Sequence, residues 1–314
     1  MRLKKPTRVV RNSVCHSALW DTYRPRSGDI VIATYPRSGT TWMQRIVDLL
    51  IFQTSDPRPV WGISPHLDGR PGEPIETIYA RLEAQTHRRF LKSHLPINAF
   101  PVYDEVKYIH VARDPREACL SLFEYLQNRT PALVEATDRI SLEDSKVEQK
   151  AKKFPKSPND FFENWLGRGV EMGAPFMSDM FFEIERSFWQ ERQCENVLLV
   201  HYSDLSANLA EEMRRISEFL GIPINLDCWS SLVDAATFAS MKRSGATILP
   251  GVTDELSNGV DGFLARGTVG RWKDVLSEDA LERFAALLGA ETTPGLARWL
   301  LSGREGADPR ESLD

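Results

Sequence analysis

The 314-residue sequence lacks the features that would place it in several special classes of protein. Its four cysteines (Cys15, Cys119, Cys194 and Cys228) are widely spaced and form no C-x-x-C pair, which argues against a zinc site or a disulfide framework. No stretch approaches the ~18 consecutive apolar residues of a membrane span. The formal net charge is −5, so the basic excess typical of nucleic-acid-binding proteins is also missing. We therefore expect a cytoplasmic protein with reduced thiols, no membrane span and no nucleic-acid partner.

The sequence also lacks internal repeats, a linker and a secretory signal. The basic start, residues 1–14, is not followed by a long apolar run, so it is not a signal peptide. We expect residues 1–27 to form an N-terminal arm, 28–300 a single domain, and the polar residues 301–314 a flexible tail.

Short apolar runs, each followed by a helical pattern, predict buried parallel strands in βα units. The strongest runs are 29–35, 107–112 and 197–202, and a weaker one is 87–91. The predicted fold class is therefore α/β: a single domain with a central, mainly parallel β-sheet flanked by helices.

Helix signals follow the strands at the expected places. Apolar residues recur at helical spacing from Met43 to Ile51, which predicts a helix that packs on a sheet. After the second strand, Asp114 can cap a helix, Pro115 suits its first turn, and Glu117 completes a D-x-x-E capping box. A third helix is predicted over 209–220. Residues 128–157 and 244–270 are expected to be loops or lids.

The segment Thr34-Tyr-Pro-Arg-Ser-Gly-Thr-Thr-Trp42 joins the first predicted strand to its helix. Such a junction presents free backbone N–H groups and the positive end of the helix dipole. Gly39 permits a close approach of an anion, Arg37 adds a charge, and Ser38, Thr40 and Thr41 add hydroxyls. This composition predicts a phosphate site, although a capped turn without a ligand is the alternative. The Walker lysine and a partner Asp for magnesium are missing, which argues against an ordinary ATPase or GTPase.

A second anion site is predicted at the end of the second strand. Arg113 ends this strand, and ligands of open parallel sheets bind beyond the carboxyl ends of the strands. Ser121 lies eight residues later, about two helical turns. The alternative is that Arg113 pairs with a carboxylate and Ser121 is an ordinary helix residue. The basic, glycine-punctuated segment 266–273 could close over the same phosphate.

Four blocks, in this order, resemble the family of sulfotransferases that use 3′-phosphoadenosine 5′-phosphosulfate (PAPS). The blocks are 34–42, Lys92-Ser-His-Leu-Pro96, the stretch from Val111-Ala-Arg-Asp114 to Ser121, and Arg266-Gly-Thr-Val-Gly-Arg-Trp-Lys273. The resemblance covers residues 28–282 and implies a P-loop-NTPase-like sulfotransferase fold.

The resemblance also implies a role for each matching residue. PAPS, which leaves as 3′,5′-ADP, would be bound by Arg37, Ser38, Gly39, Thr40, Thr41, Trp42, Arg113, Ser121, Tyr202, Phe238, Arg266 and Gly267. Trp42, Tyr202 and Phe238 would surround adenine, although by themselves they could be core aromatics. The catalytic residues would be His94, Lys92 and Arg37, with no metal.

The implied reaction is in-line transfer of a sulfuryl group to the hydroxyl of a small-molecule acceptor. His94 would be the general base, because an imidazole accepts a proton near neutral pH. Lys92 and Arg37 would stabilise the charge that develops on the leaving phosphate. Two residues along a strand share a face, so Lys92 and His94 should point the same way. His110 and His201 lie in apolar strands and are expected to be core or edge residues.

The chain departs from the family pattern at several positions. Arg37 replaces a usual lysine, Ala265 removes one phosphate contact, and Arg271 replaces an aspartate. The short dimer motif of the animal enzymes is altered over 273–282, so we expect a monomer or weak homodimer.

Two other functions stay open at this point: an atypical nucleotide kinase, which would require magnesium, and a degenerate nucleotide-binding protein that has lost catalysis. The acceptor class is also open. Trp61, Phe100 and Phe123 are candidates for its pocket.

Overall fold

The computed structural model describes the chain at residues 2–145, 147, 155–167, 176–264 and 269–314. Its centre is a four-stranded sheet in the order β3-β2-β5-β6, and every neighbouring pair is parallel. The strands are β2 (Ile30–Ala33), β3 (Phe90–Ser93), β5 (Lys107–Ala112) and β6 (Val197–His201). The predicted α/β class and parallel sheet are confirmed.

The weakest of the predicted strands begins later than expected. The sequence placed it at 87–91, whereas β3 starts at Phe90, opposite Ile30 of β2. The preceding Arg89 is fixed by its side chain instead, because its guanidinium binds the buried carboxylate of Asp29 at 2.5 and 2.9 Å. The shift matters for the site, because it places Lys92 inside the strand and His94 immediately after Ser93.

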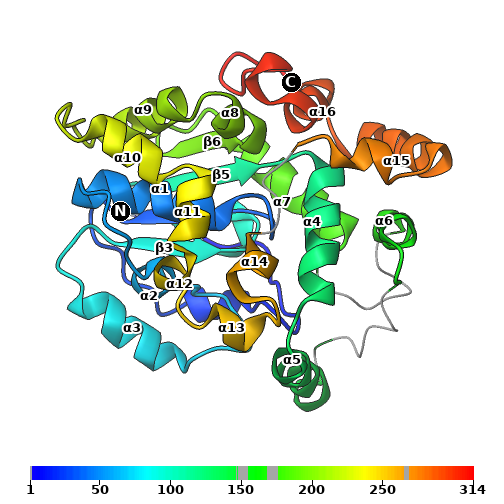
Figure 1. The fold of residues 1–314 in the computed structure, drawn as a ribbon, viewed down its shortest axis with the longest axis horizontal. Helices are drawn as coiled ribbons and strands as arrows, with labels where there is room; N and C mark the ends of the chain where they lie inside the picture. Colours follow the sequence, from blue (N-terminus) through cyan, green and yellow to red (C-terminus); the bar gives the residue numbers. More distant parts are fainter. Residues whose placement is uncertain (1, 146, 148–154, 168–175, 265–268) are drawn as a thin grey trace.

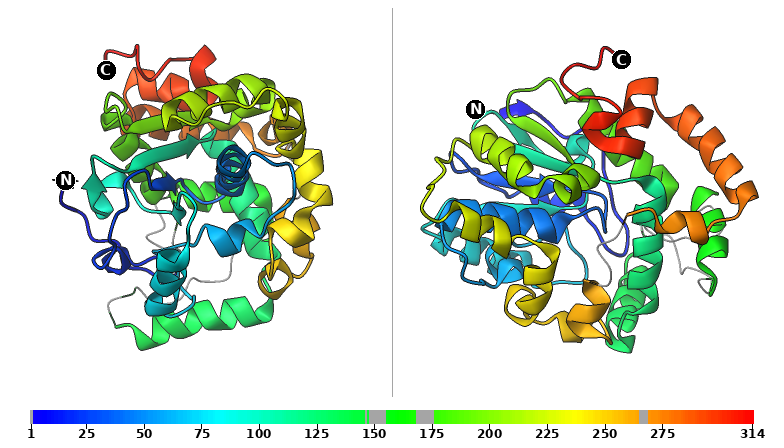
Figure 2. Two further views of the ribbon diagram at one scale, coloured as in Figure 1. Left: turned by 90° about the vertical axis from the view of Figure 1, so that its left-hand side faces the viewer. Right: turned by 45° about the horizontal axis from the view of Figure 1, so that its top comes forward.

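Helices cover both faces of the sheet (Figures 1 and 2). Alternate strand residues point to opposite faces, so Ile30 and Ile32 belong to one core cluster and Val31 and Ala33 to another. The first cluster is covered by α1 (Thr40–Phe52), α9 (Leu209–Leu220) and α10 (Trp229–Ala235). The second is covered by α4 (Pro115–Gln127), α6 (Pro158–Leu166), α7 (Ser178–Gln190), α15 (Glu278–Glu291) and α16 (Pro294–Ser302).

The start of α4 confirms one predicted cap and corrects another. Asp114 Oδ1 accepts a hydrogen bond from the backbone N–H of Arg116 at 2.9 Å. Glu117, expected to complete a capping box, instead accepts from the N–H of Gly270 at 2.7 Å. Its buried carboxylate gains a partner in this N–H, and the bond ties α4 to the C-terminal basic segment. The predicted end of α9 is confirmed at Gly221, whose φ of +64° suits glycine.

Two stretches expected to be loops contain helices. Within 128–157 lies α5 (Pro131–Glu143), which Thr130 caps by accepting from the N–H of Leu133. Thr130 followed by Pro131 was a start signal that the composition of the stretch concealed. Within 244–270 lie three helices of four or five residues, too short for a periodic signal: α12 (Gly245–Ile248), α13 (Val252–Glu255) and α14 (Gly259–Phe263). They share a small core with α2 (Val60–Ile63) and α11 (Phe238–Arg243).

The two terminal segments pack on the domain. Strand β1 (Arg2–Lys4) pairs with β4 (Val102–Tyr103), and Trp20 and Tyr23 are buried. At the other end, Arg310 donates to the carbonyl of Val197 at 2.9 Å and Trp189 donates to the carbonyl of Asp314 at 3.3 Å. Parts of the expected arm (residues 1–27) and tail (residues 301–314) are thus in contact with the domain. Helices α3 (Ile75–Ala84) and α8 (Tyr202–Ala207) complete the elements that bear on the site.

Among the helices that the structure describes, none is both long enough and apolar enough to cross a bilayer.

Candidate active site

A cavity of about 460 Å³ opens at the carboxyl ends of the parallel strands. It gathers most of the residues that the sequence singled out, although they come from distant parts of the chain. Those that line it are Arg37, Gly39, Thr40, Thr41, Trp42, Lys92, His94, Arg113, Ser121, Tyr202 and Phe238. Arg266 and Gly267 lie outside the residues that the structure describes.

The turn between β2 and α1 has the shape of an anion cradle. Arg37 (φ +69°) and Gly39 (φ +109°) both take the left-handed conformation. A Cβ on Gly39 would lie 3.1 Å from the ring of Tyr202, so glycine also provides the room for close packing. The hydroxyl of Ser38 is buried and has no hydrogen-bond partner in the described part of the chain. A buried orphan hydroxyl next to a helix N-terminus is the kind of donor that a phosphate would satisfy.

Arg37 reaches across the cavity to the elements that face the turn. Its Nη2 donates to the carbonyl of Phe263 at 2.7 Å, and its Nε donates to Ser121 Oγ at 3.3 Å. The guanidinium also lies 4.5 Å from the centre of the Phe263 ring and 5.4 Å from that of Tyr125. Burial lowers the pKa of Arg37 to about 10, which leaves it charged at neutral pH. One side chain thus links the first cradle, α4 and α14.

Arg113 lies on the same side of the sheet, beside the first cradle. Its Nη1 donates to the backbone carbonyl of Arg37 at 2.9 Å, and its guanidinium lies 4.2 Å from the centre of the Tyr202 ring. A carboxylate partner, the alternative for this arginine, is present in Glu117 at 3.6 Å. Even so, Arg113 Nε is buried and unpartnered among the described atoms. The two predicted anion cradles therefore meet at one edge of the sheet.

The three predicted adenine-binding aromatics are also close together. Trp42 donates through Nε1 to the carbonyl of Ala236 at 2.8 Å, which fixes its indole. The Trp42 and Tyr202 rings are 5.1 Å apart in an edge-to-face arrangement. Phe238, the first residue of α11, is only partly buried and faces the same cavity. All three residues line the cavity, and Trp42 and Tyr202 also pack on the core, which was the alternative.

His94 is held in one orientation beside the cradle. Its Nδ1 lies 2.8 Å from the carbonyl oxygen of Thr34, which can only accept, so Nδ1 carries the proton and Nε2 of the neutral ring has the free lone pair. Burial, followed by the charge of Lys92 and the neighbouring His66, keeps the pKa of His94 well below 6.5. The imidazole is therefore neutral at physiological pH. Burial also lowers the pKa of Lys92, whose side chain lines the same cavity.

His110 and His201 are core residues, as predicted. His110 is fully buried and bonded to Glu185 at 2.8 Å and to the carbonyl of Ala33. His201 bonds Ser203 and the carbonyl of Leu300.

The aromatic residues expected for the acceptor pocket are only partly right. Trp61 lines the cavity, but Phe100 is fully buried against Trp20, and Phe123 packs on Phe161. Both rings pack on the core, and the spacing of apolar residues in the sequence did not distinguish core-facing from cavity-facing aromatics. The apolar wall is instead formed by Ile78, Leu122, Leu126, Leu133 and Phe176.

His66 and Asp68 are site residues that the sequence did not identify. His66 lines the cavity and its ring lies 4.9 Å from that of His94. Asp68 is fully buried directly behind it. The two precede His94 by more than twenty residues, and no pattern in the sequence connects them.

Cys15, His66 and Asp68 come within 4.8 Å of one another, although the sequence indicated no metal site. We assign no ion to them. Burial raises the pKa of the Cys15 thiol well above its usual value, and Asp68 already accepts hydrogen bonds from three nitrogen donors.

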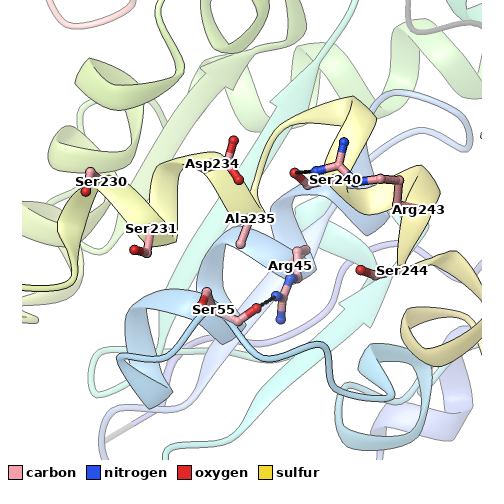
Figure 3. A pocket seen from close by; sticks show the side chains of 9 residues that line it. All are labelled: Arg45, Ser55, Ser230, Ser231, Asp234, Ala235, Ser240, Arg243 and Ser244. Carbon is pink, nitrogen blue, oxygen red and sulfur yellow. Dashed lines mark hydrogen bonds between the residues drawn. The ribbon is translucent and has the colours of Figure 1, made fainter.

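A second, polar hollow of about 500 Å³ shares no lining residue with the cavity (Figure 3). Arg45 lies at its base, but this guanidinium is buried and already pairs with Asp48 and with the carbonyls of Ser55 and Asp56. We give this hollow no role.

Comparisons with known proteins agree with the geometry. A family model described as a sulfotransferase domain matches residues 27–293. The chain is similar to the glycolipid sulfotransferase of Mycobacterium bovis (33% identity, covering 96% of each chain) and to sulfotransferase 2B1 of Mus musculus (30% identity, covering 84% of this chain and 71% of the relative).

Solved structures show the same fold. Mouse sulfotransferase SULT7A1 complexed with PAP has a TM-score of 0.68 at 18% identity, with 98% of this chain and 100% of that chain covered. Retinol dehydratase in complex with androsterone and PAP has a TM-score of 0.66 at 21% identity, with 87% and 83% covered. The family match does not favour the alternative of a nucleotide kinase, and the chain belongs to the sulfotransferase family.

Proposed function

We propose that this sulfotransferase moves a sulfuryl group from PAPS to a hydroxyl of a small-molecule acceptor, with His94 as the general base. The observation that carries the proposal is that two anion cradles and one oriented, neutral imidazole line a single cavity. A nucleotide with phosphates at both its 3′ and 5′ ends matches two neighbouring cradles in a cavity that is also lined by aromatic side chains.

The residues suit such a nucleotide. The 5′ end would be held by the turn around Ser38 and Gly39 and by the N-terminus of α1. The unpartnered hydroxyl of Ser38 would donate to a phosphate oxygen there. Arg113 and Ser121 would hold the 3′-phosphate, to which Arg113 has an unused Nε–H to offer. Trp42, Tyr202 and Phe238 would enclose the base, and Thr40 and Thr41 would add donors. Arg266 and Gly267 would complete the 3′ site from the segment outside the described residues.

When bound, PAPS supplies a sulfuryl group activated by a phosphate leaving group. His94 Nε2 takes the proton from the acceptor hydroxyl as its oxygen attacks, while Nδ1–H stays on the carbonyl of Thr34. Lys92 and Arg37 place positive charge where the leaving phosphate becomes more negative. For this role Arg37 must exchange its contacts with Ser121 and Phe263 for the nucleotide, and its planar fork is a less compact donor than lysine.

We infer that the acceptor is amphiphilic. The cavity combines an apolar wall with the guanidinium groups of Arg70, Arg81 and Arg129. A lipid-like portion could lie along the wall while a hydroxyl-bearing head reaches His94. The name of the mycobacterial relative, a glycolipid sulfotransferase, supports acceptors of this class.

A nucleotide titration tests the proposal directly. We expect 3′,5′-ADP to stabilise the protein by about 2.7 kcal/mol at a hundredfold excess over Kd, because the ligand binds only the folded state. Differential scanning fluorimetry with increasing 3′,5′-ADP measures this, and 5′-AMP, which lacks the 3′-phosphate, is the matched control. A melting curve that does not move with saturating 3′,5′-ADP would contradict the proposal.

The pH dependence of kcat/KM tests the state of the base. Because the pKa of His94 is lowered well below 6.5, the imidazole stays unprotonated as the pH falls through 6.5. We therefore expect kcat/KM to hold through that value and to fall only at distinctly more acidic pH, where His94 gains a proton. An acid limb centred at 6.5 or above would show that the base is a different group or is solvated.

The proposed setting is the cytoplasm, because all four cysteines are free thiols. A monomer or weak homodimer is proposed from the altered motif over 273–282.

A further inference from the structure

Behind His94 lies a pair of residues that the mechanism above does not use. Residues 65–67 run beside β3: the N–H of Lys92 donates to the carbonyl of Pro65 at 2.9 Å, and the N–H of Leu67 donates to the carbonyl of Lys92 at 3.3 Å. This pairing brings His66 and Asp68 next to the base, although they lie 28 and 26 positions before it.

Asp68 is a fully buried carboxylate with donors on both oxygens. Oδ2 accepts from the backbone N–H of His94 at 3.1 Å and from His66 Nε2 at 3.3 Å, and Oδ1 accepts from Trp20 Nε1 at 3.3 Å. His66, through its charge and its hydrogen bond, and His94, through its backbone N–H, hold the pKa of Asp68 well below its usual range, in spite of its burial. The group is therefore a fixed negative charge, and one of its bonds is to the peptide of the base itself.

His66 connects Asp68 to the cavity, because it bonds the carboxylate and lines the cavity wall. Because Asp68 accepts at Nε2, this nitrogen bears the proton, and the ring stands nearly perpendicular to that of His94, at 82° and 4.9 Å. The space it occupies is confined, because a Cβ on Gly69 would lie 2.5 Å from His66 Nδ1. The absence of a side chain at Gly69 thus permits this position of the imidazole.

We propose that Asp68 and His66 are positioning residues for His94: Asp68 fixes the backbone of the base and orients His66, and His66 supports the His94 ring from the side of the cavity. The proposal rests on the proposed role of His94. It also explains why a carboxylate is buried near a site that must bind an anionic donor, since Asp68 accepts hydrogen bonds from His94, His66 and Trp20 and is not among the residues that line the cavity.

Several other charged groups surround the pair. The positive charge of Lys92 on β3 lowers the pKa values of both His66 and His94. The Cys15 thiol also lies close enough to interact electrostatically with Lys92, Asp68 and Arg70. Substitutions within the pair leave all of these in place. The direction in which each variant moves the pKa of His94 can therefore be attributed to the substituted residue.

Three variants test the proposal by the pH profile of kcat/KM, measured in EDTA so that no adventitious metal contributes. Burial lowers the pKa of His66, so its imidazole opposes the protonation of His94 only at acidic pH, where both rings titrate. H66Q removes that like charge and should move the acid limb to higher pH, by about one unit. G69A should do the same, because it displaces His66 without deleting a polar group. D68N removes an opposite charge and should move the limb to lower pH, with kcat reduced by about ten- to a hundredfold as the base loses its fixed position.

Opposite displacements in H66Q and D68N, with G69A following H66Q, would support the proposal. Unchanged limbs, or displacement of all three in the same direction, would overturn it and leave the pair a purely structural role. Stabilisation by 3′,5′-ADP reports whether each variant is folded. If D68N does not fold, the proposal is still tested by whether the acid limbs of G69A and H66Q move in the same direction. Failure of the proposed function is recognised separately, because the unsubstituted protein would then show no transfer.

Discussion

Replacing His94 by alanine is expected to lower kcat by about 10²–10⁴-fold while leaving the affinity for 3′,5′-ADP nearly unchanged. The side chain is the only described imidazole whose Nδ1 is fixed on the carbonyl of Thr34 with Nε2 left as a lone pair at the cavity. The nucleotide cradles use other residues, so binding should survive. Initial rates with labelled PAPS give kcat, and calorimetry with 3′,5′-ADP gives Kd.

A matched control is H87A, because His87 precedes the same strand but does not line the cavity. It should turn over like the unsubstituted protein. Normal turnover of H94A would show that the base has been assigned wrongly. Loss of turnover together with loss of 3′,5′-ADP binding would indicate that the substitution collapsed the site rather than removed a proton acceptor.

The parallel sheet could be predicted because each strand is a short apolar run bounded by turn signals, and buried parallel strands have that form. The strand ending at Ser93 was placed too early, because Lys92 and Ser93 are polar and interrupt the apolar run. Lys92 is polar because it lines the cavity, whereas Ser93 is buried and its hydroxyl accepts from the backbone N–H of Leu95. At Lys92 the error therefore came from a functional requirement that overrides strand composition.

The segments covering the site could not be predicted in the same way. Helix α5 is amphipathic, but its first turn follows Asn128 and Thr130, which resemble the start of a loop. The helices α12, α13 and α14 are shorter than the window of about 11–18 residues in which helical periodicity can be recognised, and their core with Met241 forms only in the folded chain. Local composition indicated loops or lids, whereas tertiary packing builds helices.

That the residues proposed to bind the nucleotide gather in one cavity could be predicted, because most of them lie at or just after the end of a parallel strand. The supporting residues could not, since they depend on contacts between segments that the sequence separates. Phe176 is such a case: it takes a left-handed conformation with φ of +65°, its carbonyl accepts from Tyr35 Oη, and its ring lies 5.9 Å from that of His94. Neither Phe176 nor Asp68 belongs to a pattern, and only the fold brings them to the base.

Arg113→Ala should weaken 3′,5′-ADP binding by roughly 10- to 150-fold, the effect of losing charge-assisted hydrogen bonds worth about 1.5–3 kcal/mol. The KM of the acceptor should change little, because Arg113 lies between the first cradle and Tyr202 rather than along the apolar wall. Calorimetric titrations with 3′,5′-ADP and with 5′-AMP measure the difference. The variant should bind both almost equally, since the residue acts on the 3′-phosphate.

Arg116→Ala is the matched control on the same helix. Its guanidinium stacks on Trp272 at 3.6 Å and pairs with Asp114, and it does not line the cavity. It should therefore change stability without separating the two nucleotides. If Arg113→Ala lowered the affinities for 3′,5′-ADP and 5′-AMP equally, Arg113 would be supporting the turn at Arg37 through its carbonyl rather than contacting the 3′-phosphate. The two cradles would then have to be regarded as a single site for one phosphate, because Arg37, whose Nε donates to Ser121 Oγ at 3.3 Å, belongs to the first cradle.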